Sequence, residues 1–524
     1  MEILFTDMKD EGAIAVAGSK GENLLRLGRL GLRVPPAFIL GTAACRTALD
    51  TRGGLTTEAR DALRDGIARL ERATRRTFGG SLPLLVSVRS SPPVSMPGML
   101  STVLNVGMTP AVERRLLQTT GNPSFVWDTS RRFVESYVQT VSGCSPQPFS
   151  LLRDEALASA GCSSLDELDP LALRDLAHES HRLAAAASST LPDDAFAQLE
   201  AAVAAVITSW DSPRASAYRR MSHLDDSSGT AVVVQAMVFG NWNVASGAGV
   251  AFTRNPSTGD PRLYYEFVFN AQGEDVVSGR QRVLHERLGN RLPNLEEQLG
   301  AAAAALEAEF RDMQDFEFTV QDGELYFLQT RTGKRTPWAA VQIAADLVRS
   351  RVITADEALS RLQAYDRASI HRSRLDAAAG VIPIATAMSA SIGAVTGRIV
   401  LDPARAASSA NSGPVILVRD DLATDDFAGL VHCAGVLTAR GGRTSHAAVV
   451  ARQFGRVCLV ACPSLRIETD ARRCAIGGRW FAEGALITLD GESGSIYAGA
   501  VPMVDERPDD AWRVLDQASL LPIT

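Results

Sequence analysis

The hydrophobic positions in the first half of the chain fall into short runs and longer amphipathic stretches. Three runs rich in β-branched and aromatic residues, at 83–91, 230–240 and 262–270, predict strands. Alanine-rich stretches at 191–210 and 296–313 predict helices. Strands mixed with helices in this way indicate an α/β fold.

Helical patterns dominate two further parts of the chain. Nearly all of the stretch between about 109 and 210 reads as helix, which predicts a helical insertion in the mixed α/β region. Two shorter helical segments, near 338–350 and 354–363, come before an apolar stretch rich in Gly and Ala. We therefore expect a helical linker at 335–380.

A second domain is predicted after this linker. Short strand-like runs alternate there with turns and helices, which is typical of a compact α/β domain covering 381–504. Residues 505–524 predict a C-terminal tail with at most one short helix. The strand-like runs are GRIVL, PVILVR, AGVLTA, RVCLVA and LITLDG.

Composition and charge narrow the kinds of partner that the protein binds. The 524 residues have a net charge of −7, and an acidic surface does not attract nucleic acid or an anionic membrane. The N-terminus lacks the apolar core of a signal peptide, and no run of eighteen apolar residues occurs. The seven cysteines are scattered without metal-ligand spacing, as expected of reduced thiols in a cytoplasmic protein.

Two basic residues lie in segments suited to phosphate. Lys20 stands among small residues in GSKG, where a backbone can approach phosphate closely, although the same four residues also form ordinary loops. Arg89 ends a buried strand that leads into a loop rich in Ser, Pro and Gly. Its planar guanidinium group suits phosphate oxygens, and a surface salt bridge is an equally good interpretation of this segment alone.

The segment DFEFTVQDGELYFLQTR (315–331) predicts a β-hairpin with polar residues on one face. A three-residue loop at 321–323 would place Asp315 opposite Gln329, with Glu317 and Arg331 projecting from the same face. A two-residue Asp-Gly turn would place Gln329 opposite Phe316 and scatter the set. Oxygen ligands from Glu317 and Gln329 suit Mg²⁺, whereas a solvated hairpin face is the simpler alternative.

The stretch GGRTSHAAVVARQFG (441–455) predicts a helix that begins next to His446. Two glycines permit a tight turn, Thr444 or Ser445 can cap the helix, and small apolar residues continue it. The exposed N–H groups at a helix N-terminus disfavour an imidazolium ion and favour an anion. His446 is therefore suited to carry a phosphoryl group, although a structural histidine is the common interpretation of such a tripeptide.

Six stretches together resemble the pyruvate, phosphate dikinase family, and the resemblance continues to about residue 515. It implies an ATP-grasp nucleotide-binding domain over 1–334, interrupted by the helical insertion, and a swivelling α/β phosphohistidine domain over 381–504. The stretches are GSKGENLLRLGRLGLRVPPAF, LLVSVRSSPPVSMPGMLSTVLN, MVFGNWNVASGAGVAFTRNPSTG, EFVFNAQGEDVV, DFEFTVQDGELYFLQTRTGKRT and GGRTSHAAVVAR.

The resemblance implies a reaction at His446. In that family the matching histidine accepts the β-phosphoryl end of ATP, AMP leaves, and inorganic phosphate removes the terminal phosphoryl group as pyrophosphate. The position matching Thr444 is phosphorylated for regulation in some members, and a helix-capping role is the simpler expectation here. ATP and inorganic phosphate are thus the implied small-molecule partners, and Mg²⁺ is the implied cofactor.

The resemblance also implies roles in the nucleotide region. Residues matching Lys20, Arg89 and Arg331 hold phosphates, and those matching Glu317 and Gln329 bind the metal. Further implied contacts are Asp315 beside the metal ligands, the backbone around Gly98 in a phosphate-binding loop, the segment from Gln235 to Val238 as the adenine-side hinge, and Glu266 near ribose or metal.

Two departures from the family pattern matter. Ser19 stands where the family has a second glycine, so a side chain is added where the backbone approaches phosphate. In the dikinase a C-terminal barrel holds phosphoenolpyruvate and pyruvate, and this sequence stops where the linker to that barrel would begin.

The phosphoryl acceptor therefore stays open. The chain is expected to be an ATP-dependent phosphotransferase that charges His446 and passes the phosphoryl group to a separate acceptor, which is a small molecule or is bound by a partner protein. The alternatives are one half of a split dikinase, a regulatory phosphohistidine carrier acting on another protein, and an inactive ATP-binding scaffold. The retained charged residues disfavour the scaffold.

Overall fold

The computed structural model describes residues 3–6, 16–49, 53–94, 96, 99–187, 191–221, 224–278, 292–376, 380–422, 426–443 and 446–519. The chain divides into two compact units, which are described separately. Unit 1 comprises residues 1–247 and 318–330, and unit 2 comprises residues 248–317 and 331–524. The predicted domain boundaries stay a prediction.

Unit 1 is built on a five-stranded antiparallel sheet in the order β1-β2-β7-β5-β6. Strands β5 and β7 are buried almost throughout because helices α1 and α8 pack against both of them. The strands are β1 (Ile3–Phe5), β2 (Ala37–Leu40), β5 (Val86–Ser91), β6 (Thr102–Val106) and β7 (Ala231–Ala236); the short strands β3 (Thr77–Phe78) and β4 (Pro83–Leu84) pair with each other.

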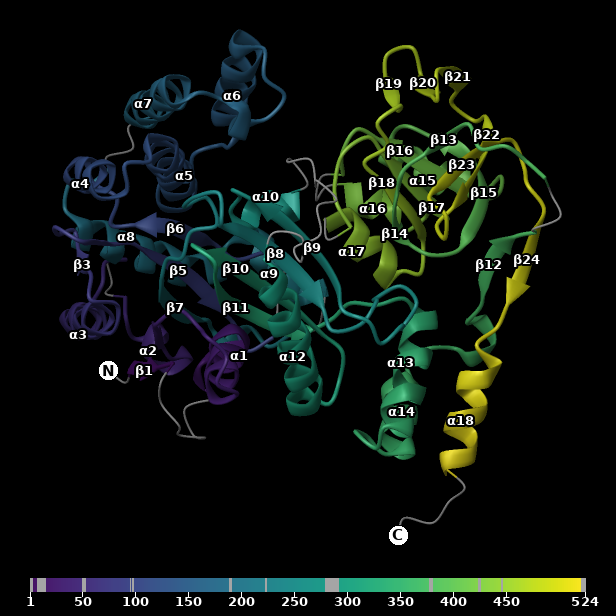
Figure 1. The fold of residues 1–524 in the computed structure, drawn as a ribbon, viewed down its shortest axis with the longest axis horizontal. Coiled ribbons are helices and arrows are strands. Elements are labelled where there is room, and N and C mark those ends of the chain that lie inside the picture. Colours follow the sequence, from purple (N-terminus) through teal and green to yellow (C-terminus); the bar gives the residue numbers. More distant parts are fainter. Residues whose placement is uncertain are drawn as a thin grey trace. The chain divides into compact units, whose positions relative to one another are not determined.

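Helices fill the stretch of unit 1 that the hydrophobic pattern predicted to be helical, and several of them lie on one side of the sheet (Figure 1). They share one core with the sheet, into which Phe125, Phe133 and Leu199 are buried. The helices of unit 1 are α1 (Gly18–Arg29), α2 (Thr42–Arg46), α3 (Thr57–Thr74), α4 (Pro110–Thr120), α5 (Pro123–Val141), α6 (Gln147–Ala160), α7 (Pro170–Ala186), α8 (Ala195–Thr208) and α9 (Pro213–Met221).

Local sequence explains where these helices begin. Thr109, Asn122 and Asp169 each cap a helix by accepting a hydrogen bond from a backbone N–H two or three residues ahead, and each is followed by proline. Proline fits the first helical position because its fixed φ suits a helix and that position needs no N–H. In unit 2 Thr336 and Pro337 start helix α13 (Pro337–Arg349) in the same way.

A four-stranded sheet in the order β11-β10-β8-β9 carries the predicted hairpin. The division between the two units passes through this hairpin, so residues 318–330 belong to unit 1 and its ends belong to unit 2. The strands are β8 (Gly247–Phe252), β9 (Tyr264–Phe269), β10 (Gln314–Gln321) and β11 (Glu324–Thr332); the neighbouring helices are α10 (Gly273–Ser278) and α12 (Pro293–Phe310).

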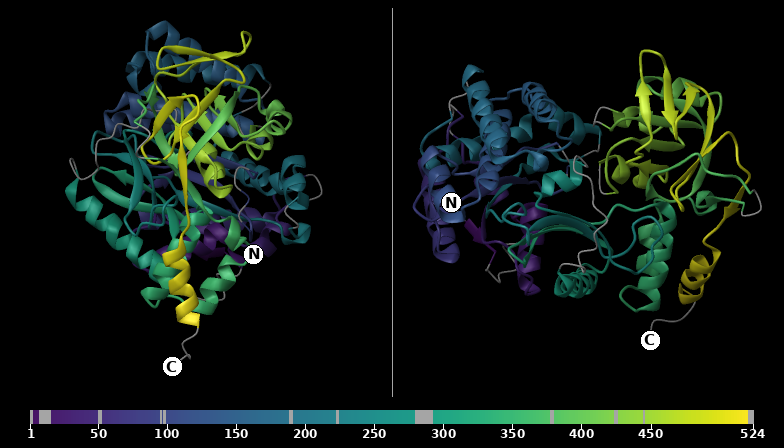
Figure 2. Two further views of the ribbon diagram at one scale, coloured as in Figure 1. Left: turned by 90° about the vertical axis from the view of Figure 1, so that its right-hand side faces the viewer. Right: turned by 45° about the horizontal axis from the view of Figure 1, so that its top comes forward.

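The C-terminal segment of unit 2 returns to the predicted linker. Strand β12 (Arg372–Leu375) pairs antiparallel with β24 (Met503–Glu506). Figure 2 shows the C-terminal segment, in yellow, ending in a helix near the end of the chain marked C. Helix α18 (Asp509–Ser519) packs against α13 and α14 (Ala355–Leu362), where Trp512 and Leu515 are buried. The short helix expected in the tail is therefore part of a folded core.

The rest of unit 2 is an α/β domain around an eight-stranded sheet in the order β13-β23-β22-β15-β16-β17-β18-β14. All five predicted strand runs are strands of this sheet. Its strands are β13 (Ala385–Thr386), β14 (Met388–Ser391), β15 (Ala394–Val400), β16 (Val415–Arg419), β17 (Gly435–Thr438), β18 (Val457–Val460), β22 (Leu486–Asp490) and β23 (Ser495–Ala498); a small sheet contains β19 (Arg466–Glu468), β20 (Arg473–Ile476) and β21 (Arg479–Ala482).

Both faces of this sheet are buried. Strands β15 to β18 run parallel, and successive residues such as Ile416 and Leu417 enter two different cores. Helices α15 (Ala406–Ala410), α16 (Phe427–Leu430) and α17 (His446–Gln453) lie beside this sheet, and their buried residues belong to one of the two cores. This explains why the runs are continuously hydrophobic rather than alternating.

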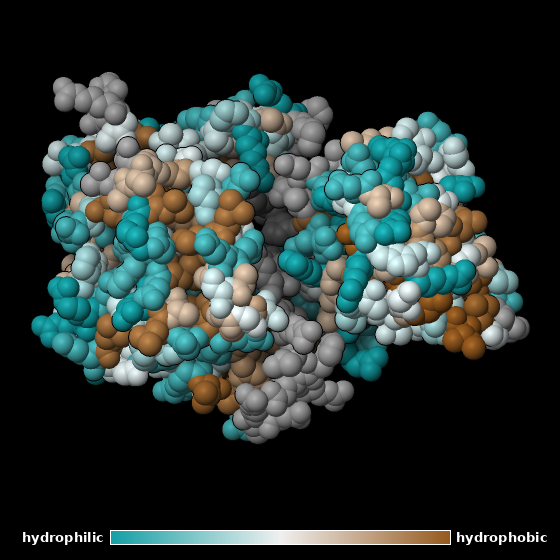
Figure 3. Space-filling view, turned by 90° about the horizontal axis from the view of Figure 1, so that it is seen from above, coloured by the Kyte–Doolittle hydropathy of each residue, from teal (hydrophilic) through white to brown (hydrophobic). Residues whose placement is uncertain are grey.

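The molecular surface mixes polar and apolar residues over the face seen in Figure 3. None of the helices in the described ranges has the length and apolar character that a membrane span requires. Cys433, Cys458, Cys462 and Cys474 are buried, and burial raises the pKa of the Cys458 thiol to about 12. Cys458 and Cys462 are thus core residues.

Candidate functional site

The first turn of helix α1 holds Lys20 beside the end of strand β5. Gly18 has a φ of +66°, and a Cβ there would lie 1.8 Å from the carbonyl oxygen of Ser91, so the close approach requires glycine. The hydroxyl of Ser91 accepts a hydrogen bond from the N–H of Gly21 (3.0 Å). Lys20 is half-buried in this turn. GSKG therefore forms a helix N-terminus, which favours anions, rather than an ordinary loop.

Ser19 is hydrogen-bonded to the segment after strand β5, and its effect on phosphate binding stays a prediction. Its hydroxyl donates to the carbonyl oxygen of Pro92 (2.9 Å), and its backbone N–H donates to the same oxygen (2.9 Å). The side chain is therefore turned toward the segment that follows β5. The serine ties helix α1 to this segment.

Arg89 and Gln329 meet within unit 1. Nη2 of Arg89 on β5 donates to Oε1 of Gln329 on β11 (3.0 Å). Gln329 is buried and Arg89 is half-buried, so the amide holds a guanidinium group that keeps access to solvent. Asn23 on α1 also donates to the backbone carbonyl of Thr330 (2.6 Å). These bonds join α1, β5 and β11 at the residues predicted to bind phosphate and metal.

Asp315 and Arg331 form an ion pair within unit 2. Nε of Arg331 lies 2.7 and 2.9 Å from the two carboxylate oxygens of Asp315. Burial raises the pKa of Asp315, against the attraction of Arg331. The negative charges of Asp315 and Glu317 raise the pKa of Arg331. Asp315 and Glu317 are two residues apart on β10 and project from the same face of the strand, and Arg331 pairs with the first of them.

The predicted three-residue loop of the hairpin is wrong. Gln321 ends strand β10, and the turn consists of Asp322 and Gly323 alone, with φ values of 53° and 78°. Positive φ at both central residues is the geometry that an Asp-Gly hairpin favours. A two-residue turn was expected to scatter Asp315, Glu317, Gln329 and Arg331. In the structure Arg331 nevertheless contacts Asp315, and Gln329 contacts Arg89. The shared face of Glu317 and Gln329 stays a prediction.

Two further candidates from the resemblance are engaged inside the fold. Gln235 lies in β7 at the centre of its sheet, and its side chain donates to the carbonyl oxygen of Pro35 (3.2 Å). Val238 follows the strand and is half-buried. The adenine-side hinge stays a prediction that would use the backbone after β7. Gly98 lies outside the described residues.

Glu266 on β9 contacts the loop that leads to His446. Its carboxylate accepts a hydrogen bond from the backbone N–H of Arg443 (2.8 Å), and a Cβ on Gly442 would lie 3.1 Å from one of its oxygens. Glu266 is only 4% exposed, so this loop occupies the carboxylate in unit 2. A contact of Glu266 with ribose or metal stays a prediction.

His446 is the first residue of helix α17, as the sequence predicted. Ala448 and Ala451 anchor this short helix in the core beside β17 and β18. Thr444 and Ser445, the candidate capping residues, lie outside the described residues. The helix N-terminus is a favourable place for a residue that becomes an anion.

Sequence reasoning passed over Arg452, the largest fully buried side chain in the described part of the chain. Its Nη1 donates to the backbone carbonyl of Arg443 (2.7 Å), in the loop just before His446. An arginine inside the apolar stretch that follows the histidine was the available signal, because a buried charge requires a partner.

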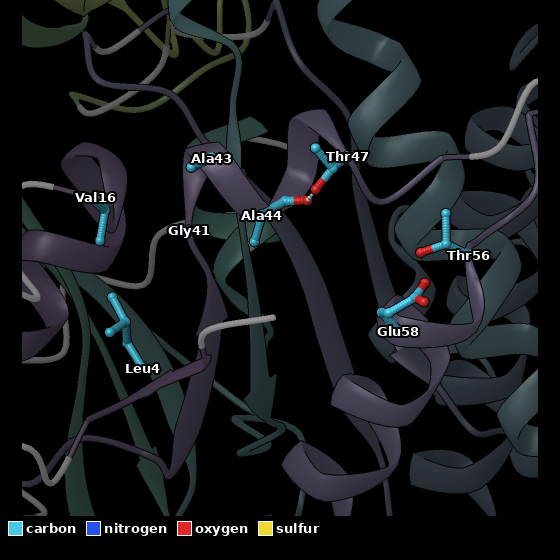
Figure 4. A pocket seen from close by; sticks show the side chains of 8 residues that line it. All are labelled: Leu4, Val16, Gly41, Ala43, Ala44, Thr47, Thr56 and Glu58. Atoms are coloured by element: carbon cyan, nitrogen blue, oxygen red, sulfur yellow. Dashed lines mark hydrogen bonds between the residues drawn. The ribbon is translucent and has the colours of Figure 1, made fainter.

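The pocket in Figure 4 has a volume of about 470 Å³ and contains none of the candidate residues. Its lining is mainly small and apolar, with Glu58 as its charged group, so it is not suited to phosphate. Within the described ranges, no group of three or more His, Cys, Asp and Glu side chains could hold a metal ion. The lining residues are Leu4, Val16, Gly41, Ala43, Ala44, Thr47, Thr56 and Glu58.

Comparison with known proteins agrees with this architecture. The family described as "Pyruvate phosphate dikinase, AMP/ATP-binding domain" matches residues 54–283, and the family described as "PEP-utilising enzyme, mobile domain" matches residues 412–494. The first match contains Arg89, and the second contains His446 and helix α17. The chain is therefore a multidomain α/β protein that combines a nucleotide-binding region with a mobile domain.

Whole-protein relatives identify the family. Pyruvate, phosphate dikinase of Clostridium symbiosum is 42% identical over 492 residues, covering 92% of this chain and 56% of that protein. The dikinase of Rhizobium meliloti (strain 1021) is 39% identical, covering 96% and 58%, and the chloroplastic dikinase of Flaveria trinervia is 38% identical, covering 93% and 51%. The chain belongs to the pyruvate, phosphate dikinase family. It spans slightly more than half the length of these relatives.

Proposed function

We propose that this protein is an ATP-dependent phosphotransferase that charges His446 with a phosphoryl group from ATP. The observation that carries the proposal is that two guanidinium groups are each held by a partner side chain, one within unit 1 and one within unit 2. Gln329 of strand β11 holds Arg89, and Arg331, two residues further on, is held by Asp315. Accessible guanidinium groups in fixed orientations, beside oxygen donors, are suited to a polyphosphate.

Each cationic residue has a place in this proposal. Lys20, in the first turn of α1, neutralises phosphate charge together with the helix N-terminus. Arg89 and Arg331 orient phosphate oxygens and stabilise the charge that develops during transfer. The chain as a whole is acidic. The positive charge for phosphate therefore comes from these three basic residues and not from the net charge.

The oxygen donors fit Mg²⁺. Glu317 supplies a half-buried carboxylate, and Oε1 of Gln329 keeps a second lone pair besides the one that accepts from Arg89. Mg²⁺ prefers such hard oxygen ligands and is commonly held by one or two side chains together with substrate phosphates and water. When bound, the ion would neutralise phosphate charge.

The proposed chemistry at His446 involves two bond exchanges. A neutral imidazole nitrogen attacks the β-phosphorus of ATP, the bond from that phosphorus to the oxygen that it shares with the α-phosphorus breaks, and AMP leaves. Inorganic phosphate then takes the terminal phosphoryl group, which releases pyrophosphate and leaves one phosphoryl group on His446. The N-terminus of α17 favours both the neutral imidazole at the start and the anionic product.

The phosphoryl group then passes to an acceptor at a separate site, which is a small molecule or lies on a partner protein. The relatives are named for pyruvate and phosphate, so pyruvate is the first acceptor to test. A regulatory carrier acting on a protein and one half of a split dikinase remain the alternatives. The acceptor distinguishes them, because the charging reaction is common to all three.

The test is self-labelling of the purified chain. With ATP, Mg²⁺ and inorganic phosphate, we expect AMP and an acid-labile, base-stable phosphoramidate, because a phosphorylated imidazole is stable to base and cleaved by acid. The variant His446→Ala is expected to show no labelling. β-³²P-labelled ATP distinguishes this reaction from ordinary γ-phosphoryl transfer, which would leave ADP as the sole nucleotide product and label no protein.

Either of two results would overturn the proposal. ADP without AMP, or label that persists in His446→Ala, would mean that the chain transfers the γ-phosphoryl group or uses another residue. Adding pyruvate to the charged protein separates the acceptor question from the charging reaction, since it is scored by loss of label and formation of phosphoenolpyruvate.

A further inference from the structure

The loop before His446 contains an arginine peptide that is held at both ends by charged side chains. The N–H of Arg443 donates to the carboxylate of Glu266 (2.8 Å), and its carbonyl accepts from the guanidinium group of Arg452 (2.7 Å). Hydrogen bonds to charged groups are about twice as strong as neutral ones. The peptide therefore has little freedom, although Gly441 and Gly442 precede it.

Arg452 lies six residues after His446 on the same helix. Its side chain is completely buried, and the same Nη1 atom that contacts Arg443 also donates to the carbonyl oxygen of Ala390 on β14 (3.0 Å). Ser257 donates to that carbonyl as well (3.4 Å). Arg452 thus joins helix α17, strand β14 and the loop that enters the helix.

Burying the guanidinium group of Arg452 costs free energy, and this cost indicates a role beyond packing. Among the described residues, neither Nε nor Nη2 of Arg452 has a hydrogen-bond partner. The guanidinium group lies over the ring of Phe252, 5.4 Å from its centroid. Burial lowers the pKa of Arg452, while Tyr264, Cys458 and Glu266 oppose this. An apolar side chain of similar volume would fill the same space without this penalty.

We propose that Arg452 is a positioning residue for His446. It fixes the carbonyl of Arg443 and thereby the point at which helix α17 begins with His446. This inference rests on the proposed function, because it assigns a task in charging His446. Arg452 joins the carbonyls of Arg443 and Ala390. Both carbonyls and His446 lie between residues 388 and 456. The restraint is therefore internal to the part of the chain that bears the histidine.

The experiment compares Arg452→Met, Arg452→Lys and a matched control. Arg456→Met is the control, because Arg456 also donates to a backbone carbonyl, that of Val431 (3.2 Å), which lies outside the loop before His446. We measure the rate of His446 labelling, the KM for ATP, and amide hydrogen exchange of the peptide containing residues 441–450.

We expect Arg452→Met to slow labelling about 100-fold, the cost of a small misplacement of a reacting group. The KM for ATP should stay unchanged, because Lys20 and Arg89 are untouched. Exchange should rise in the 441–450 peptide and not in β16, β17 or β18. Arg452→Lys should recover part of the rate, because an ammonium group can still donate to one carbonyl. Arg456→Met should label within about threefold of the wild-type chain.

Three results would overturn the inference. They are wild-type labelling by Arg452→Met, equal loss in Arg456→Met, and increased exchange throughout the eight-stranded sheet, which would indicate general destabilisation. If the wild-type chain does not label at all, the proposed function fails. The exchange measurement alone then decides whether Arg452 holds the loop.

Discussion

At the scale of single residues, the candidate site consists of charged groups held by specific partners. Arg89 is held by Gln329, and Arg331 by Asp315, so each guanidinium group already has a fixed direction. Glu317 differs from Asp315 because it is half-buried rather than buried. This accessibility makes Glu317 the better candidate for metal binding, and Asp315 the group that orients Arg331.

Glu317→Gln is expected to weaken Mg²⁺-dependent labelling. The change removes one negative charge and no core volume, so the fold should persist while the apparent affinity for Mg²⁺ falls at least about tenfold, or about 1.4 kcal/mol. A Mg²⁺ titration of the labelling rate measures the effect. Glu324→Gln is the matched control on the next strand, because Glu324 is exposed and pairs with Arg33. Equal effects of the two changes would contradict the metal assignment.

At the scale of elements, ion pairs within helix α5 and a hydrogen bond from the segment after β7 meet at one carboxylate. Asp128 on α5 accepts hydrogen bonds from Arg131 (2.6 Å), Arg132 (2.8 Å) and Asn241 (3.0 Å). Burial alone would raise the pKa of Asp128, but the guanidinium groups of Arg132 and Arg131 lower it below its ordinary range. Removing the charge of Asp128 leaves Arg132 without this carboxylate, while Arg131 keeps Glu135 as a partner.

The interaction of Asp128 with Arg131 and Arg132 predicts how the free energy of unfolding depends on pH. The pKa of Asp128 is lower in the folded state than in the unfolded state. Its contribution to the free energy of unfolding is therefore present above the unfolded pKa of about 3.9 and is lost as pH falls through the folded pKa. Asp128→Asn should lower the free energy of unfolding at pH 7 by about 1–3 kcal/mol, because Arg132 loses its carboxylate while Arg131 keeps Glu135. The variant should also lose less stability than the wild-type chain between pH 5 and pH 3. Calorimetric unfolding at several pH values measures both, and parallel pH profiles would contradict the assignment.

At the scale of the whole molecule, the residues proposed to bind the nucleotide and the histidine proposed to be charged lie in different parts of one chain. Lys20 and Arg89 belong to unit 1, and His446 belongs to unit 2. Covalent linkage gives two groups joined by a flexible connection an effective concentration in the millimolar range. Charging within one chain should therefore be far faster than charging between chains at micromolar protein.

A mixture of two inactive variants tests this expectation. Arg89→Met and His446→Ala should each fail to label, and an equimolar mixture at about 1 μM should label at no more than about one thousandth of the wild-type rate. The rate per chain should rise in proportion to protein concentration, which is the sign of transfer between chains. A mixture that labels at nearly the wild-type rate would show that chains charge one another.

The sequence by itself determined the parts of this protein that depend on local pattern. Continuous hydrophobic runs predicted the strands of the eight-stranded sheet, because both of its faces are buried. Small residues after His446 predicted a helix beginning there, and the motifs identified the family. Capping residues followed by proline mark helix starts through contacts only a few residues apart.

Only the tertiary structure decided which distant residues meet. The bond between Arg89 and Gln329 joins residues 240 positions apart, and the contact of Glu266 with the Arg443 peptide joins residues 177 apart. The hairpin turn was mispredicted by one residue because turn geometry and strand register depend on packing as well as on composition. The burial of Arg452 and the docking of α18 on α13 were likewise set by long-range packing. Local patterns carry no record of such contacts, since side chains far apart in sequence meet only after the elements pack.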